Sequence, residues 1–385
     1  MKKIIFSYFK KSIILYLILN IVLFSILNFS KKHENLYIQS SSSQFNSSIA
    51  YNHIINQLNF GYRVPGTISH KNCAGYIYEQ VLKYSDSVLY HNFTKDSINC
   101  FNILAKLNIH KSNIVIFGAH WDSRAVAEKD PDPNLKNLPI PGANDGASGV
   151  AVLLELARVL FDKKNQINAQ IWFLFLDAED QGLSNGMYGI SNWNWCEGSK
   201  LFTENLNIFY NNDENILCFI LLDMVGGTNL RFIREYSYSS EKLYDDIWTI
   251  GKELGFETQF PKDPIYKTII DDHMYFHAKN IPSIDLIIDF SSGNPYWNHH
   301  HKHSDDLINI DQFSLEVTGK TLERYIIKLF TSTNLPNYDD LNNPLNPIVY
   351  ILIIIISGLG IGIFIIILIR FKKLRKINKE LRIVK

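Results

Sequence analysis

The chain has 385 residues, of which 46% are hydrophobic and 13% are aromatic, so its composition excludes a disordered protein and suffices for one large core. Its formal charge of zero conceals an asymmetry, because residues 1–32 contribute +6 and residues 347–385 contribute +7, which leaves −13 for the middle. An acidic middle argues against nucleic acid, and we expect no nucleic-acid partner.

The first element in chain order is an apolar segment at residues 13–29. Four Lys residues precede it, and no small-residue cleavage site follows it. We interpret residues 1–32 as a basic cytoplasmic start with an uncleaved membrane anchor, and a signal peptide is the close alternative. Residues 33–48 are polar and rich in serine, as expected of a stalk.

Residues 49–335 are predicted to form the main folded domain. Hydrophobic periodicity indicates helices at residues 49–60 and 69–84, which would cover a sheet. Apolar runs indicate strands at residues 101–107, 114–117, 171–176 and 216–222. Later elements are expected as a strand at 231–236, helices at 241–254 and 271–279, a strand at 283–288 and a closing helix at 311–330. The loop at 125–141 is long, which is more often a functional feature than an idle one.

Acidic residues and a histidine follow the apolar strands. They are His120, the pair Glu179 and Asp180, and Asp223, while Asp145 opens the helix between the first two of these strands. Ligands of open α/β sheets bind beyond the carboxyl ends of the strands, so these side chains would converge on one rim. Closely packed carboxylates repel each other unless a cation lies among them or one is protonated, and nitrogen with oxygen ligands suits zinc. The pattern favours a metal site.

Each of these residues also has an ordinary structural explanation. Asp145 alone would be interpreted as a helix N-cap, and Glu179 with Asp180 could be a solvated turn. Acids or a histidine after three separate strands are harder to attribute to solubility. The run of histidines at residues 299–303 is typical of loose metal binding or biased composition, and only its place beside Asp305 and the closing helix favours one of them as a ligand.

Four cysteines, Cys73, Cys100, Cys196 and Cys218, show no CxxC spacing and are poor candidates for metal ligands. Cys218 lies in an apolar run, which is typical of a buried thiol. A disulfide between Cys73 and Cys100 is conceivable in an oxidising compartment, although nothing else in the sequence supports it.

The C-terminal part is predicted to return to the membrane. Residues 336–346 are a linker, and residues 347–370 are a transmembrane helix with 22 uncharged residues at 348–369. Five basic residues begin at Arg370, so by the positive-inside rule residues 371–385 form a cytoplasmic tail. The acidic domain would then be extracytoplasmic, either extracellular or lumenal.

Over residues 60–330 the sequence resembles the glutaminyl-peptide cyclotransferases, or glutaminyl cyclases, particularly bacterial members related to the animal enzymes. The matching segments are FGYRVPGTISHKNCAGY, GAHWDSRAVAEKDPDPN, PGANDGASGVAVLLELAR, FLDAEDQG, WCEGS, ILLDMVGG, DDHMYF, IPSIDLIIDF and HKHSDDLINID. The wider superfamily of zinc aminopeptidases shares the fold and most ligand positions. The resemblance implies an α/β fold, a three-layer α/β/α domain with a mostly parallel mixed central sheet, here flanked by the N- and C-terminal membrane segments.

The resemblance also implies the roles of individual residues. Asp145, Asp180 and His301 would hold one zinc ion. Glu179 would be the general acid and base, and Asp223 and Asp271 would share protons with it. The sequence departs from the animal enzymes at Asp180, where they have Glu, and in the three residues between Trp297 and His301, where the family has Trp directly before the zinc histidine. We choose His301 over His299 and His300 because its spacing to Asp305 matches the family.

The expected function is zinc-dependent cyclisation of N-terminal glutamine in peptides or proteins to pyroglutamate, with release of ammonia. Trp193, Trp195 and Trp297 are candidates for an aromatic pocket wall, although each could equally be core. One alternative is a two-zinc aminopeptidase, in which His120 and Asp223 bind the second metal. Another alternative is a catalytically inactive ectodomain that only binds a partner. The expected partners are a peptide with N-terminal Gln and the membrane.

Overall fold

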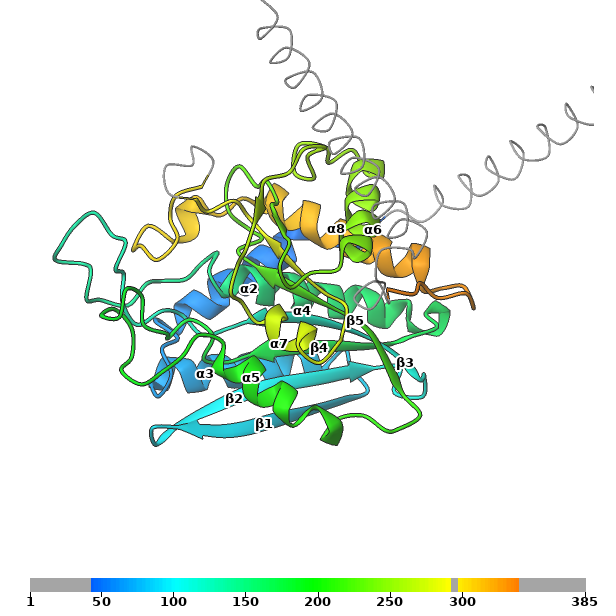
Figure 1. Ribbon diagram of the computed structural model, residues 1–385, viewed down its shortest axis with the longest axis horizontal. Helices are drawn as coiled ribbons and strands as arrows, with labels where there is room; N and C mark the ends of the chain where they lie inside the picture. Colours follow the sequence, from blue (N-terminus) through cyan, green and yellow to red (C-terminus); the bar gives the residue numbers. More distant parts are fainter. Residues whose placement is uncertain (1–42, 292–296, 339–385) are drawn as a thin grey trace, which may run out of the picture.

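The computed structural model describes residues 43–291 and 297–338 (Figure 1). Both predicted membrane segments, the basic start and the basic tail, most of the stalk and most of the linker lie outside these residues. Within the described part of the chain, no helix is both long enough and apolar enough to cross a membrane.

A six-stranded mixed sheet forms the centre of the domain, in the order β1-β2-β4-β3-β5-β8. Its strands are β1 Ser87–Lys95, β2 Ile98–Leu107, β3 Asn113–His120, β4 Gln170–Leu176, β5 Asn215–Asp223 and β8 Ser283–Ile287. The four strands β4, β3, β5 and β8 are parallel, while β1 and β2 are antiparallel to their neighbours. The predicted α/β class with a mostly parallel mixed sheet is confirmed.

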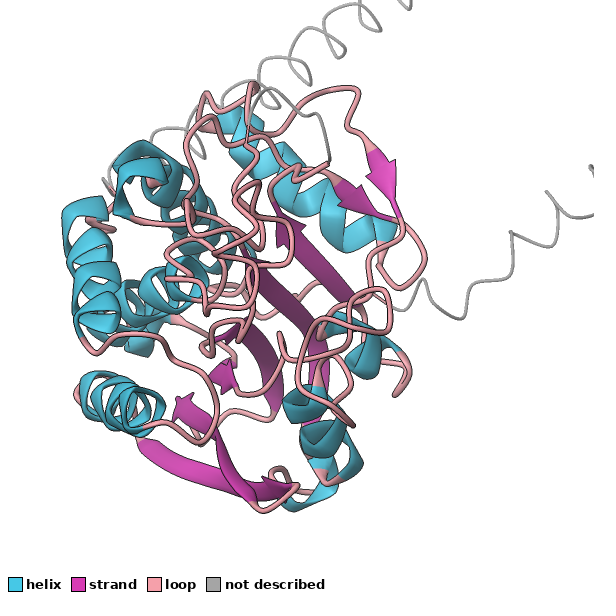
Figure 2. Ribbon diagram, turned by 90° about the vertical axis from the view of Figure 1, so that its left-hand side faces the viewer, coloured by secondary structure: helices cyan, strands magenta, loops and turns pink. Residues whose placement is uncertain are grey.

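Helices cover both faces of this sheet (Figure 2). Because side chains alternate along a strand, β3 places Val115, Phe117 and Ala119 in the larger core and Ile114 and Ile116 in a second, smaller one. The larger core is covered by α2 Ser47–Asn59, α3 Ile68–Leu82, α4 Ala147–Asp162, α6 Glu241–Glu253 and α8 Gln312–Leu329. The smaller core is covered by α5 Glu197–Glu204 and α7 His273–His277. The three-residue helices are η1 Lys164–Gln166, η2 Leu206–Ile208 and η3 Leu307–Asn309.

Most predicted elements exist within a few residues of their expected bounds, but the strand expected at residues 231–236 is wrong in extent. Only β6, Arg234–Glu235, is a strand, and it pairs with β7, Tyr266–Lys267, in a separate two-stranded sheet. The reason is that the backbone of this segment bonds in several directions, since Phe232 bridges to Ile288 and its N–H donates to the carbonyl of Gln259.

The four cysteines are buried and free, so Cys73 and Cys100 do not form a disulfide, and Cys218 is the buried thiol that was predicted.

Helix α4 lies unusually close to the sheet at Gly149. A Cβ atom at this position would lie 2.2 Å from the carbonyl oxygen of Leu222 in β5 and 2.9 Å from the Cβ of Ala119 in β3. Only a residue without a side chain permits this approach. The contact fixes the first turn of α4, and with it Asp145, against the carboxyl ends of two strands.

Gly149→Ala should therefore destabilise the domain by about 1–3 kcal/mol, because the added methyl group must push α4 away from β5. Urea unfolding measures the loss. Gly75→Ala in α3 is the matched control, since a Cβ there meets no atom within 4 Å and Ala is the better helix former by about 1 kcal/mol. A Gly149→Ala variant as stable as the Gly75→Ala variant would contradict the close contact.

Candidate metal centre

The carboxyl edge of the parallel strands gathers the residues that the sequence singled out. His120 ends β3, Asp223 ends β5, and Glu179 and Asp180 follow β4 after a turn at Ala178, which has a φ of 57°. Asp145 lies just before α4. All five candidate side chains are buried, with at most 8% of their surface exposed.

Asp145 lies between two histidines. Its Oδ1 is 3.2 Å from Nε2 of His120, which is also 3.2 Å from Oδ1 of Asp223. Its Oδ2 is 3.9 Å from Nε2 of His301, which is 3.1 Å from Oδ1 of Asp180. The structure therefore places the predicted ligand His301 near both Asp145 and Asp180. Asp145 has ligand atoms within 4.8 Å of those of His300 and His301, and the same holds for the alternative set His120, Asp145 and Asp223.

Two observations show that these residues fit a metal ion. Oδ2 of Asp145 and Oδ2 of Asp180 are buried without a hydrogen-bond partner, which is costly unless a cation completes the site. Ligands about 2.0–2.1 Å from a tetrahedral zinc are about 3.3 Å apart. The pairs His301–Asp180, His120–Asp145 and His120–Asp223 are 3.1, 3.2 and 3.2 Å apart, and the pair His301–Asp145 is wider, at 3.9 Å. The mixture of imidazole nitrogen and carboxylate oxygen is a zinc donor set.

The charges around the centre also favour a cation. Burial raises the pKa of the Asp180 carboxyl to about 6, and the nearby Asp145 adds to the shift while His301 opposes it. Burial opposes a positive charge on His120, but its hydrogen bonds to Asp122, Asp145 and Asp223 outweigh burial and raise its pKa well above the ordinary value. The acidic surroundings therefore attract positive charge to this edge.

His301 is held by a chain of charged contacts that the sequence did not reveal. Its Nδ1 is 2.6 Å from Oε1 of Glu128, and Oε2 of Glu128 accepts a hydrogen bond of 2.7 Å from Nε of Arg124. Burial alone would raise the pKa of Glu128, but the contacts with His301 and Arg124 hold it at about 2. An ionised acceptor at Nδ1 leaves Nε2 free as a ligand atom, which is the usual arrangement of a metal-bound histidine.

The neighbouring histidines are engaged differently. His299 Nδ1 is 2.8 Å from the hydroxyl of Ser304, and His300 Nδ1 accepts from Nζ of Lys129 at 2.6 Å. Nε2 of His300 is 3.9 Å from Oδ2 of Asp145, so this histidine lies beside the centre without the carboxylate support that His301 has.

Glu179 lies next to the predicted ligand Asp180 and points toward a second acidic group. The Cys196 thiol donates to Oε1 of Glu179 at 3.3 Å, and Glu179, Cys196 and Asp271 lie within 4.8 Å of one another. Burial raises the pKa of the Glu179 carboxyl well above its ordinary value; His120 opposes the shift, while Asp271 and Asp180 add to it. A raised pKa suits a carboxyl that takes up and returns a proton during a reaction.

Several supporting residues were missed from the sequence. Asp122 accepts the N–H groups of Glu179 and Asp180, at 3.1 and 3.2 Å, and so fixes the turn that carries both. Asp305 does the same for Asn144 and Asp145, at 2.8 and 3.0 Å. The sequence signal for Asp122 was its place two residues after His120 at the end of a buried strand. Arg124 and Glu128 gave no such signal, because they act from a loop.

The three tryptophans do not form one pocket wall. The ring of Trp195 is nearly parallel to that of His301, with centroids 5.9 Å apart, and the guanidinium of Arg124 lies 4.5 Å from the Trp195 ring centroid. Trp193 packs with Cys100 in a small separate core, and Trp297 belongs to the main core. Trp195 is thus the one of the three seen against a candidate ligand.

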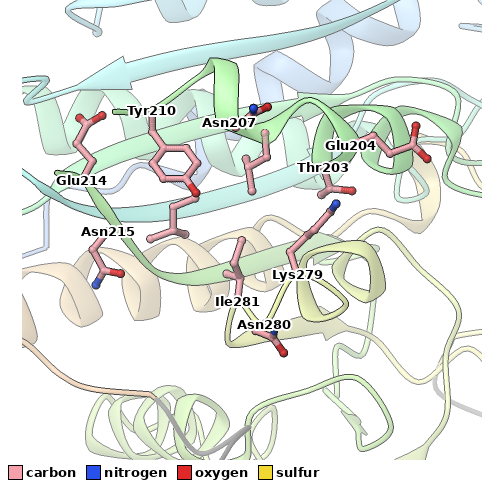
Figure 3. A pocket seen from close by; sticks show the side chains of 11 residues that line it. Thr203, Glu204, Asn207, Tyr210, Glu214, Asn215, Lys279, Asn280 and Ile281 are labelled. Atoms are coloured by element: carbon pink, nitrogen blue, oxygen red, sulfur yellow. The ribbon is translucent and has the colours of Figure 1, made fainter. Parts of the chain in front are cut away.

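A cavity lies elsewhere, at the amino end of β5 rather than its carboxyl end (Figure 3). Its volume is about 450 Å³, and its walls include Tyr210, Asn215 and Lys279. None of the candidate site residues lines it.

Comparison with known proteins shows similarity to a peptidase family, to a Zn-dependent exopeptidase and to glutaminyl cyclases. The model of peptidase family M28 matches residues 102–326. A Zn-dependent exopeptidase from Parabacteroides distasonis is 32% identical with a TM-score of 0.68, over 74% of this chain and 99% of that one. A glutaminyl cyclase from Bacteroides thetaiotaomicron, solved with bound N-acetylhistamine, is 31% identical with the same coverage and TM-score. Aminopeptidase YwaD of Bacillus subtilis is 27% identical over 50% of this chain, but the match spans only 35% of YwaD.

Glu128→Gln should weaken zinc binding by about 10–100-fold, because His301 loses the charged acceptor that orients it. Competition with a chelator of known affinity measures the change. Asp130→Asn is the matched control, since Asp130 is a buried carboxylate of the same loop that accepts the backbone N–H groups of Asp132 and His303 instead. Equal zinc affinity in Glu128→Gln and the unmutated chain would refute the role of Glu128.

Proposed function

The chain belongs to peptidase family M28, and we propose that it is a zinc-dependent glutaminyl-peptide cyclotransferase, which converts the N-terminal glutamine of a peptide or protein into pyroglutamate and releases ammonia. The observation that carries the proposal is the similarity to solved glutaminyl cyclases, at 30–31% identity across 99% of their chains. The arrangement around Glu179 supports it, since cyclisation needs one group that takes up and returns a proton.

A second candidate is a two-zinc aminopeptidase. The specific observation in its favour is the close approach of His120, Asp145 and Asp223, which could hold a second ion beside the first. Relatives described as exopeptidase or leucine aminopeptidase precursor match as well as the cyclases do. The two candidates differ in the number of ions and in the need for a water nucleophile, and both use Glu179.

In the proposed reaction, Asp145, Asp180 and His301 would hold zinc, which supplies a Lewis acid for the side-chain amide of the substrate. Glu179 accepts a proton from the substrate α-amine and returns it to the departing ammonia. The Cys196 thiol donates to one oxygen of Glu179 at 3.3 Å and so restrains this carboxyl group. Asp271 and Asp223 belong to the same buried network and share its protons. The attacking amine and the amide belong to one molecule, so proximity comes from the substrate itself.

Glu179→Gln keeps the shape of the side chain and removes its titratable proton, so activity should fall by about 10²-fold or more while zinc stays bound. Asp180→Ala is the comparison variant, because loss of a ligand should remove zinc together with activity. Activity and zinc content are measured on the same preparations. A Glu179→Gln variant with undiminished activity would show that another group carries the proton.

The reaction itself is tested with Gln-led and Leu-led peptides offered to the purified chain. Cyclisation yields ammonia and a product about 17 mass units lighter, because NH₃ leaves during intramolecular attack. We expect this product from the Gln-led peptide, no free leucine from the Leu-led peptide, and one zinc per chain at the centre. Release of leucine by a chain that holds two zinc ions at the centre would replace the cyclase with the aminopeptidase.

A further inference from the structure

A second buried group of metal-ligand side chains lies behind the centre. It consists of Asp271 and His273 at the start of α7 and Asp285 in β8. Their exposed fractions are 3%, 0% and 0%, and one ligand atom of each lies within 4.8 Å of those of the other two. Neither candidate ligand set of the centre includes His273 or Asp285, and the group does not include Asp145.

Asp285 is the most unusual member of this group. Both of its oxygens are buried without a hydrogen-bond partner. The charges that act on it are the carboxylates of Asp271, Asp223, Glu235 and Asp272, all of which raise its pKa further after the effect of burial itself. A buried carboxylate that has no hydrogen-bond donor and lies near other carboxylates requires a proton or a cation.

His273 does not donate a hydrogen bond to Asp285, since both oxygens of Asp285 lack a partner. Its Nε2 is 3.3 Å from Oε2 of Glu235. Glu235 also accepts the N–H groups of Ser237 and Tyr238, at 2.6 and 2.8 Å. Burial opposes ionisation of Glu235, but its hydrogen bonds with His273, Tyr238 and Ser237 outweigh burial and lower its pKa. An ionised Glu235 keeps the proton on Nε2, and Nδ1 of His273 is left buried with no hydrogen-bond partner. An unprotonated Nδ1 has no N–H group to donate to a neighbouring carboxylate, but its lone pair can bind a cation.

We propose that Asp271, His273 and Asp285 form a further binding site for a divalent cation of the zinc type. Two carboxylates and one imidazole that is backed by a carboxylate are the ligands and the outer support that such a cation takes in proteins. The cation would link β8 to the start of α7, and so would hold Asp271 in place beside Glu179. The proposal is independent of which peptide reaction the centre performs.

Metal content tests the proposal on the full chain, stripped of metal and reloaded with Zn²⁺. Asp285→Asn preserves the size of the side chain and removes its charge, so it should hold one zinc per chain fewer than the unmutated protein. Asp180→Ala should lose zinc from the centre instead, and the double variant should show both losses. Asp289→Asn is the matched control, because Asp289 is a buried carboxylate just after β8 that pairs with Lys267, and its zinc content should be unchanged.

Anomalous diffraction at the zinc edge supplies a measurement that needs no variant. Crystals of the zinc-loaded chain should show a peak among Asp271, His273 and Asp285, separate from density at Asp145. An absent peak, or an Asp285→Asn variant that keeps its full zinc content, would overturn the proposal and leave shared protons as the means of neutralising the group. Failure of the cyclase assay would affect neither measurement.

Discussion

Repulsion between buried carboxylates is the constraint on which this structure depends. The carboxyl edge of the parallel strands and the region behind it bury Asp122, Asp145, Asp177, Glu179, Asp180, Asp223, Asp271, Asp272, Asp285 and Asp305. Arg63 and Arg124 supply positive charge, and backbone N–H groups supply hydrogen bonds. Such a layer is stable only if each carboxylate is paired, protonated or bound to a cation. The contacts of Asp122, Glu128 and Asp305 with backbone N–H groups, His301 and Arg124 meet this requirement.

The bridging position of Asp145 explains why one scaffold serves two chemistries. Each of its oxygens faces a different histidine, so the same carboxylate can contribute to one ion or be shared by two. The number of ions is then decided by what surrounds His120 and Asp223 rather than by Asp145. Family membership therefore restricts the possible reactions to those that use zinc and a neighbouring carboxylic acid. Which of these reactions occurs depends on the residues around the zinc and the acid.

The sequence predicted the parts of the site that belong to regular structure. His120, Glu179, Asp180 and Asp223 could be placed on one edge because they follow apolar strands, and parallel strands end together. The antiparallel strand β1 and the helix α5 were not predicted, since β1 is an edge strand of half-exposed and exposed residues and α5 follows a segment without a period. Glu128 reaches His301 from a part of the chain more than 170 residues away, and Arg124 bonds to Glu128. Such contacts depend on the path of a loop, which local patterns do not specify.

The contact between Gly149 and the carbonyl of Leu222 gives Asp145 the positional accuracy of the sheet, although it belongs to a loop. The position of this carboxylate is therefore set by the packing of α4 on the sheet and not by the loop that contains it. Engineering of a new specificity is therefore best directed at exposed positions of the segments 125–141 and 182–196, which contribute Glu128 and Trp195. Alterations to α4 would move the metal and the core together.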